Sequence, residues 1–346
     1  MFHNEVIGRR AVMPSTRALA FAEFVVPAPG PSQLLVETEA CAISPGTELA
    51  VYTGIHQWLA DPTRAWPKFP FTPGYSAVGR VAALGSDVQG YAVGQRVIWA
   101  GRQESHALVD TQAQDRPLQR IGEHVDAAVA ASTVLARFPL AALVQSGSLL
   151  GQAVAVFGLG TIGQIALRLY AAAGAYPLIG IDPVAARRQI AEHTSGVRTV
   201  DPTNGDLNTA LRELNNGELP EIVVDATGAP ATVHAAMAAV ADGGKVVMVG
   251  SPRGVAGDVD FYWHLHGRSI QLIGAHGSAI GAAPRERFPF TLDRALRLLV
   301  YFVESGRLQL ADLITQRAQP EQLQEMYEGL LHERERFLGV VIEWKP

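Results

Sequence analysis

Two short stretches of the chain carry side chains or a spacing that can do chemistry. CAISPGTELA, residues 41–50, brings a thiol, hydroxyls and a carboxylate close together, and GLGTIG, residues 158–163, spaces its glycines as G-x-G-x-x-G. Hydroxyl and carboxylate groups can take up or release a proton. A glycine turn of that spacing can hold a pyrophosphate. The chain therefore has one candidate for a proton-transfer site and one for a nucleotide site.

The glycine turn lies where a nucleotide turn must lie, between a strand and a helix. The apolar run QAVAVFG precedes it and TIGQIALRLYAAAG follows it. Gly158 makes the tight turn, Gly160 lets the backbone approach a pyrophosphate, and Gly163 lets helix and strand pack closely. The free N–H groups at the start of the helix, at Thr161 and Ile162, then face the phosphates.

An acidic residue in the next strand bears on the choice of nucleotide. The run PLIGID ends at Asp182, 19 residues beyond Gly163. A carboxylate there accepts hydrogen bonds from the adenosine ribose diol and repels a 2′-phosphate, so the sequence predicts NAD. Arg187 and Arg188 follow closely. A guanidinium can bind a 2′-phosphate, so NADP is the alternative, although helix-surface arginines are often only solvated.

Two later strand ends are predicted to complete the nucleotide site. Small residues end the runs EIVVDAT and KVVMVGS, namely Ala226 and Thr227 in the first and Gly250 and Ser251 in the second. Ligands of open parallel sheets lie at the carboxyl ends of the strands. We therefore expect these residues to line the nucleotide.

Two kinds of architecture are needed to position these residues. Residues 20–110 consist of short apolar runs punctuated by glycine and proline, which predicts an all-β unit. Residues 127–145 have a helical pattern, and strand-like runs then alternate with helical ones, which predicts a parallel doubly wound sheet. TLDRALRLLVYFVESG and PEQLQEMYEGLLHE have the pattern of amphipathic helices, and FLGVVIEW that of a last strand. The predicted fold class is α/β.

Composition and charge limit the classes of function. A chain of 346 residues, 48% of them hydrophobic, is long enough for two domains. Its net charge of −5 comes without the clustered Lys and Arg of a nucleic-acid-binding face. The single cysteine, Cys41, excludes a disulfide framework and suits a reducing compartment. The N-terminal stretch lacks the apolar region of a signal peptide, and the most apolar run, residues 127–144, contains Arg137 and Pro139. We expect a soluble cytoplasmic protein with no nucleic-acid or membrane partner.

The chain resembles the medium-chain dehydrogenase/reductase superfamily, which includes the alcohol dehydrogenases, over essentially its whole length. PGYSAVGRVAALGSDVQGYAVGQRV (residues 73–97), the glycine turn and DATGAPATVHAAMAAVADGGKVVMVG (residues 225–250) carry the resemblance. It implies a GroES-like catalytic domain, formed by residues 1–126 and 290–346, and a Rossmann domain, formed by residues 127–289. It also implies hydride transfer between nicotinamide and a small alcohol or ketone, with His276 near the nicotinamide.

The residues at the family's catalytic metal site differ from its zinc ligands. Where zinc members have a ligand cysteine this chain has Ser44, and where they have a His-Glu pair it has Tyr75 and Ser76. Cys41 matches a family cysteine that is not a ligand. Zinc needs three or four converging nitrogen, sulfur or oxygen ligands. We therefore predict no zinc, catalytic or structural.

Resemblance to smaller groups narrows the activity. SPGTE resembles the subgroup that includes bacteriochlorophyllide a hydroxyethyl dehydrogenase, and the segment beginning GLGTIG resembles bacterial glycoside (guloside or glucoside) dehydrogenases. Both imply NAD-dependent oxidation of a secondary alcohol. Without a metal a side chain must take the hydroxyl proton, and the candidates are Ser44, Thr47, Glu48 and Tyr75. Glu48 can equally support the site, and Tyr75 can simply fill the space of the metal.

Histidines and tryptophans give weaker indications. His276 is the best histidine candidate for a base, ahead of His56, although a lone histidine is more often a hydrogen-bonded structural residue. His106 and His124 fall far from the motifs. Trp58 and Trp66 lie in a loop where substrate would enter, and they can stack on a sugar face or cap a core.

Three alternatives to a glycoside or polyol dehydrogenase stay open. They are an NADPH-dependent quinone or enoyl reductase of the same superfamily, a dehydrogenase of a hydroxyethyl tetrapyrrole, and an NAD-binding protein without catalysis. The resemblance also implies a homodimer or homotetramer. Residues 228–254 and 261–276 correspond to the region where family dimers pair their sheets.

Overall fold

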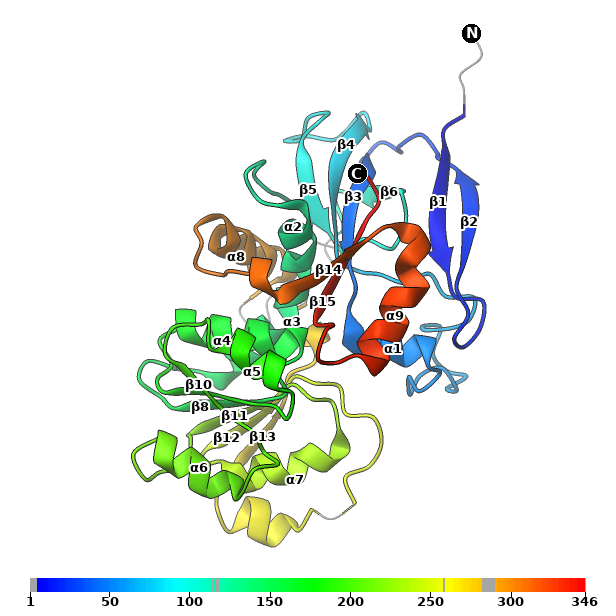
Figure 1. Ribbon diagram of the computed structural model, residues 1–346. Helices are drawn as coiled ribbons and strands as arrows, with labels where there is room; N and C mark the ends of the chain where they lie inside the picture. The colour runs from blue at the N-terminus through cyan, green and yellow to red at the C-terminus, as the bar shows by residue number, and fades with distance from the viewer. Residues whose placement is uncertain (1–4, 114, 116–117, 258, 282–289, 346) are drawn as a thin grey trace.

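A seven-stranded sheet forms the upper part of the molecule in Figure 1. The structure is a computed structural model that describes residues 5–113, 115, 118–257, 259–281 and 290–345. The strand order is β14-β15-β3-β4-β5-β7, and β6 also pairs with β3. The strands are β3 (Gln33–Ala42), β4 (Ala77–Leu84), β5 (Arg96–Trp99), β6 (His106–Asp110), β7 (Leu118–Arg120), β14 (Ile314–Ala318) and β15 (Gly339–Glu343).

Both ends of the chain contribute to this sheet. Strand β3 has period-two burial, with Leu34, Val36 and Thr38 turned inward, as expected of a strand with one face on a core. Strand β15 pairs antiparallel with the end of β3, so that Ile342 lies opposite Cys41. Strand β15, near residue 340, is therefore part of the sheet that β3 begins near residue 33.

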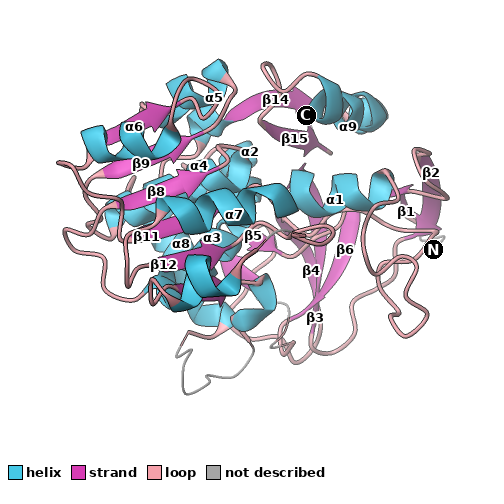
Figure 2. Cartoon of the chain, turned by 90° about the horizontal axis from the view of Figure 1, so that it is seen from below, coloured by secondary structure: helices cyan, strands magenta, loops and turns pink. Residues whose placement is uncertain are grey.

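A hairpin of β1 (Ile7–Val12) and β2 (Ala20–Val25) lies apart from both sheets. Figures 1 and 2 both place it at the end of the molecule far from the parallel sheet.

The second sheet has six parallel strands in the order β10-β9-β8-β11-β12-β13. They are β8 (Val154–Phe157), β9 (Leu178–Ile181), β10 (Val197–Val200), β11 (Ile222–Asp225), β12 (Lys245–Met248) and β13 (Gln271–Gly274). All four residues of β8, β9 and β11 are buried, because helices cover both faces. This arrangement confirms the predicted doubly wound sheet and the α/β fold class.

Helices lie on either side of that sheet in Figure 1, with α4 and α5 above it and α6 and α7 below. Their bounds are α4 (Thr161–Ala172), α5 (Ala185–Ala191), α6 (Leu207–Leu214) and α7 (Pro230–Ala239). A π-helical turn, Tyr262–His266, precedes β13. Near the C-terminus α8 (Leu292–Glu304) and α9 (Leu323–His332) are the two amphipathic helices that the sequence predicted.

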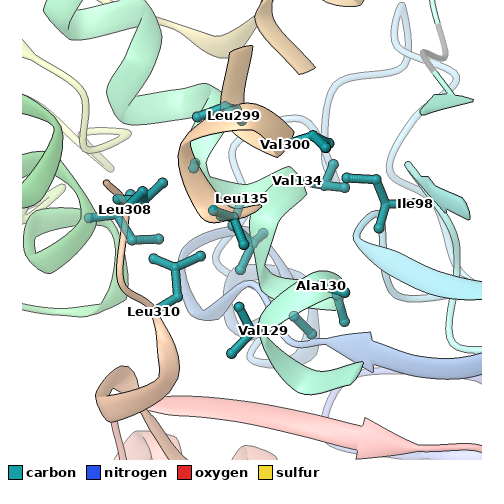
Figure 3. Close-up of a cluster of buried hydrophobic side chains, with 14 of the residues drawn as sticks. Ile98, Val129, Ala130, Val134, Leu135, Leu299, Val300, Leu308 and Leu310 are labelled. Carbon is teal, nitrogen blue, oxygen red and sulfur yellow. The ribbon is translucent and has the colours of Figure 1, made fainter. Parts of the chain in front are cut away.

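The apolar run after residue 126 forms the core between the two sheets. It comprises α2 (Ala127–Thr133), a 3-10 turn (Val134–Ala136) and α3 (Arg137–Ser146). Figure 3 shows Val134 and Leu135 packed among side chains of α8 and of the chain that follows it, including Leu299 and Leu308. By length and composition alone residues 127–146 could cross a membrane, yet 67% of the apolar window is buried inside the protein. Burial of that kind is typical of a core helix.

The structure corrects the prediction of an all-β unit over residues 20–110. Residues Pro45–Tyr52 form a helix, α1. Ser44 is its N-cap residue and Pro45 opens it, a position where a missing N–H costs nothing. The candidate chemical stretch therefore consists of the end of a strand and the first turns of a helix.

The predicted domain boundaries stay a prediction. The sheets group residues as the resemblance implied, but the boundary between residues 289 and 290 adjoins residues 282–289, which lie outside the described residues.

Candidate active site

The glycine turn leaves open space over Gly160. Gly158 has a φ of +83°, and a Cβ there would lie 2.8 Å from Thr227 Cγ2. A Cβ on Gly163 would lie 1.8 Å from the Gly158 carbonyl oxygen, so only glycine fits. A Cβ on Gly160 would meet no atom of the described residues within 4 Å. The turn is therefore tight on the protein side and open where a pyrophosphate would approach.

Helix α4 begins directly at this turn with Gly160 as its N-cap and no side chain capping it. The Thr161 hydroxyl donates instead to the Leu338 carbonyl, at 2.9 Å, so Thr161 has only its N–H to offer a phosphate. Ile162 is partly buried against the core between the sheets. An uncapped helix N-terminus is a favourable place for an anion.

Asp182 lies directly after β9, and it is 4% exposed. Its carboxylate accepts hydrogen bonds from the backbone N–H of Leu159 at 2.7 Å and of Val184 at 2.8 Å. Each carboxylate oxygen has a second lone pair. Asp182 thus holds the glycine turn and keeps acceptor capacity for a ribose hydroxyl.

The two arginines near Asp182 have different roles. Arg188 donates to the backbone carbonyls of Asp182 and Pro183 and pairs with Asp201 at 3.0 Å, so it is committed to the fold. Arg187 lies 3.9 Å from the Asp182 carboxylate, and its buried Nε has no hydrogen-bond partner among the described residues. Arg187 is the residue of the pair that can meet a ligand.

The loops after β11 and β12 touch each other at glycines. A Cβ on Gly250 would lie 2.4 Å from the Gly228 nitrogen. Ala226 is partly buried and Ser251 is exposed. The Thr227 hydroxyl donates to Asp225 at 2.6 Å, so its side chain holds the loop. The predicted cofactor residues thus come together at the carboxyl edge of the sheet, and they fit a dinucleotide.

Three hydroxyl groups meet at the start of α1. The Tyr75 hydroxyl is hydrogen-bonded to Ser44 Oγ and donates to Thr47 Oγ1 at 3.2 Å. Burial raises the pKa of Tyr75, and the two hydroxyl contacts and the charge of Arg137 lower it in part. The Tyr75 ring packs edge-on against Phe138, with centroids 5.7 Å apart. The structure therefore brings together three of the four predicted catalytic residues.

Glu48, the fourth candidate, is turned away from this group. It is fully buried, and its two oxygens accept hydrogen bonds from the Ser44 N–H and from the Tyr327 hydroxyl, both at 2.7 Å. Burial raises its pKa to about 7. Its contacts are those of a group that anchors α1 to α9 and fixes Ser44.

The side chains at this position do not fit a zinc ion. Ser44 and Tyr75 offer hydroxyl groups that are bonded to each other, and the Ser76 hydroxyl donates to the Ala131 carbonyl. The Cys41 thiol is buried against the Arg102 carbonyl, and burial raises its pKa well above the usual range. Among the described residues there is no cluster of three His, Cys, Asp or Glu side chains. A neutral hydroxyl set lacks the thiolate and imidazole ligands of catalytic zinc.

Aromatic side chains from both parts of the chain meet beside the hydroxyl group. His56 packs against Trp58 and Trp66, and Trp58 lies 6.4 Å, centroid to centroid, from His276. Trp66 is 46% exposed, which is high for the cap of a core. His276 is exposed, and its Nδ1 is paired with Ser278. Burial and the charge of Arg253 lower the pKa of His56.

His106 and His124 lie away from the site, and the site includes two arginines that the sequence analysis did not predict. His106 is in β6 and His124 is exposed in the loop before α2. Arg137 begins α3 with its guanidinium carbon 5.6 Å from the Tyr75 ring centroid. Arg253, in the loop after β12, donates to the Gly46 carbonyl in α1. The only signal in the sequence was a charged residue, Arg137, inside an apolar run.

Two family models match the chain in sequence. The model described as alcohol dehydrogenase GroES-like domain matches residues 30–137, and the one described as zinc-binding dehydrogenase matches residues 161–296. Together they cover most strands of both sheets, while β8, β14 and β15 lie outside the matched residues.

Relatives with named activities are distant. An L-threonine 3-dehydrogenase of Caldanaerobacter subterraneus is 25% identical over 66% of this chain and 71% of its own length. A D-guloside 3-dehydrogenase of Escherichia coli is 28% identical over 55% of this chain, and the match spans about half of that protein (54%).

Solved structures share the whole fold. A 2R,3R-butanediol dehydrogenase of Bacillus subtilis superposes with a TM-score of 0.81 over 98% of this chain and 100% of its own, at 18% identity. Structures of the same fold contain NADH in one case and NADP in another. The chain belongs to the alcohol dehydrogenase-like medium-chain dehydrogenase/reductase superfamily, and it is an NAD(P)-dependent oxidoreductase.

Proposed function

We propose that the protein is an NAD-dependent dehydrogenase of secondary alcohols that works without zinc, on a sugar- or polyol-like substrate, in the cytoplasm. The observation that carries the proposal is the cluster of three hydroxyls formed by Ser44, Tyr75 and Thr47. The sequence resemblance matches Ser44 and Tyr75 to positions where zinc members of the family have metal ligands. Similarity to guloside and threonine dehydrogenases supports oxidation of a hydroxyl group. The exposed Trp66, which packs edge-on against Trp58, suits stacking on a sugar ring.

In this proposal Tyr75 and Thr47 relay the substrate proton, and Ser44 holds the Tyr75 hydroxyl in place. Bound nicotinamide supplies the chemistry of accepting a hydride from the carbinol carbon. The substrate hydroxyl donates to the Tyr75 oxygen while Tyr75 donates to Thr47, which is partly exposed and passes the proton to solvent. The carbinol C–H and O–H bonds break and a ketone forms. Because the pKa of Tyr75 is raised, a relay avoids leaving a phenolate behind.

The proposed cofactor is NAD because Asp182 lies at the end of β9 and Arg188 is committed to Asp201. Arg187 is the residue that favours the alternative, NADP, since its Nε lacks a partner. We expect Asp182→Asn to weaken NAD binding and Arg187→Met to leave it unchanged. Titration of both variants with NADH and NADPH decides the matter. Loss of NADPH binding alone on Arg187→Met would assign NADP.

The test of the activity is NADH formation by chelator-treated protein with glycosides, polyols and simple secondary alcohols. Oxidation that survives chelation supports a zinc-independent dehydrogenase. Activity that chelation removes and zinc restores would overturn the zinc-free mechanism. NADPH-dependent loss of an enone absorbance, without alcohol oxidation, would assign the protein to the reductases instead.

A further inference from the structure

Two arginines beside Tyr75 have no acidic partner among the residues that the structure describes. Arg137 opens α3, Arg253 follows β12, and both side chains are partly buried. Burial lowers the pKa of each guanidinium, and among the described residues only Tyr75 acts in the opposite direction on either. A buried cation without an anion is costly, so such a pair needs an explanation.

The guanidinium of Arg137 lies over aromatic rings, and its side chain donates no hydrogen bond to another described residue. Its central carbon lies 4.8 Å from the Phe138 ring centroid and 5.6 Å from that of Tyr75. Its Nε is buried and has no hydrogen-bond partner in the described part of the chain. A carboxylate binds a guanidinium in the plane of the group, through two parallel N–H donors.

Arg253 approaches the same place from the other part of the molecule. It donates to the Gly46 carbonyl, and the adjacent Pro252 carbonyl accepts from Gln57 at 2.8 Å. Its charge also lowers the pKa of His56. Arg253 thus lies near α1, the aromatic residues and Tyr75.

Glu48, whose charge acts on Tyr75, cannot balance two arginines. Glu48 is committed to Ser44 and Tyr327, and with a pKa of about 7 it is only partly ionised at neutral pH. Among the described residues the charge beside Tyr75 is therefore positive. A negative group on a ligand would offset the cost of burying the positive charges of the two arginines.

We propose that the substrate carries a carboxylate, which Arg137 and Arg253 bind while the hydroxyl to be oxidised contacts Tyr75. The class is that of hydroxy acids and sugar acids rather than neutral alcohols. This inference rests on the proposed dehydrogenase function and narrows it. The cofactor pyrophosphate is the other anion that two arginines can hold, but the uncapped start of α4 and the space over Gly160 already provide for it.

Matched pairs of compounds test the inference. Each pair contains an acid and a neutral alcohol: methyl β-D-glucuronide with methyl β-D-glucoside, and 3-hydroxybutyrate with 2-butanol. Initial rates are measured for wild type, Arg137→Met, Arg253→Met and Arg137→Lys. Arg198→Met, an exposed arginine on β10, is the control. Calorimetry with the protein–NADH complex measures binding of the glucuronide and glucoside, and a separate titration measures NADH affinity.

We expect wild type and Arg198→Met to prefer the acid in each pair by about tenfold or more in kcat/KM, a difference of about 1.4 kcal/mol. In either Met variant the ratio of kcat/KM for the acid to that for the neutral alcohol should fall toward one. Arg137→Lys should keep part of the preference for the acid. The NADH affinity of all these variants should equal that of wild type. Equal use of acid and neutral alcohol by wild type overturns the inference and leaves the dehydrogenase intact. Loss of NADH affinity in the Met variants with no change in the ratio also overturns it. If no compound is oxidised, the proposed dehydrogenase activity is wrong, and calorimetry then tests the carboxylate site alone. Binding of the glucuronide that is lost in Arg137→Met supports a carboxylate site. Absence of glucuronide binding to wild type overturns it.

Discussion

At the scale of single residues the site depends on Tyr75, whose hydroxyl, ring and charge environment come from different segments. Its hydroxyl meets Ser44 and Thr47. Its ring packs edge-on against Phe138, and the guanidinium carbon of Arg137 lies 5.6 Å from the ring centroid. A phenol in such surroundings is neutral at physiological pH and is a donor as well as an acceptor. Tyr75 therefore suits the two directions of alcohol–ketone conversion equally.

Replacing Tyr75 tests the relay. Tyr75→Phe keeps the ring packing and removes the hydroxyl, so kcat should fall about a hundredfold or more while NADH affinity is kept. Steady-state rates and NADH fluorescence titration measure the two effects. A kcat near that of wild type would show that Tyr75 only fills space.

Glu48 gives the protein a pH-dependent stability. Its pKa in the folded protein, about 7, is above the ordinary glutamate value of 4.5. The stabilisation from its protonated form is therefore complete below pH about 4.5 and is lost as pH rises through about 7, a loss on the order of 3 kcal/mol. Glu48→Gln keeps both hydrogen bonds and cannot ionise. We expect the Tm of Glu48→Gln minus the Tm of wild type, measured by thermal unfolding, to increase as the pH rises from 5 to 8. A constant difference in Tm across that range would show that Glu48 is ionised throughout.

The sequence predicted the candidate residues of the site but not their pairing. Ser44, Thr47 and Tyr75 were singled out by type and by resemblance. Their contact depends on α1 and on the loop before β4 packing together, and nothing local to either segment encodes it. Arg253 reaches Gly46 across 207 positions of the chain, which no spacing pattern can reveal.

At the scale of elements the glycine turn allows a matched pair of substitutions. A Cβ at Gly163 would overlap the Gly158 carbonyl, whereas one at Gly160 would enter open space at a φ of −67° that any residue adopts. We expect Gly163→Ala to lower the free energy of unfolding by about 1–3 kcal/mol. Gly160→Ala should leave stability unchanged and weaken NADH binding by about tenfold or more, because the methyl group takes the space of the pyrophosphate.

Thermal unfolding and NADH titration of both variants separate the two effects. Unchanged NADH affinity in a folded Gly160→Ala protein would place the pyrophosphate elsewhere. Each variant is thus the control for the other.

Strands and helices with a strong hydrophobic pattern could be predicted from the sequence, whereas the short helix α1 could not. The buried runs of β8, β9 and β11 and the periodic faces of α8 and α9 stand out in the sequence. Helix α1 has eight residues and follows a strand with only a bend between them. Its signals were Ser44 as a cap residue, Pro45 at the first position and an acid in the first turn, all placed inside a stretch otherwise typical of β structure.

At the scale of the whole molecule, β13 is an edge strand with apolar side chains around it. Its one neighbour among the described strands is β12, and Leu272, Phe261, Tyr262 and Trp263 are 40–68% exposed. Exposed edges and apolar patches invite pairing with another chain. We propose that two copies join here, as a homodimer or within a tetramer.

Sedimentation of Leu272→Arg tests this proposal. The variant should shift the protein toward monomer, whereas Leu150→Arg, at a position 84% exposed beyond α3, should not. A dimer that survives Leu272→Arg and an added charge at Trp263 would place the interface elsewhere.

The pairing of β15 with β3 has a consequence for biosynthesis. During translation the ribosome delivers β3 first and β15 last, and the whole parallel sheet emerges between them. Tyr327, which anchors Glu48, also comes from the last segment. The nucleotide-binding part can fold while the chain is still being made, but the sheet beside it gains β15 only after the whole parallel sheet has been made. A nascent chain stalled before residue 320 would therefore bind NADH without turning over substrate.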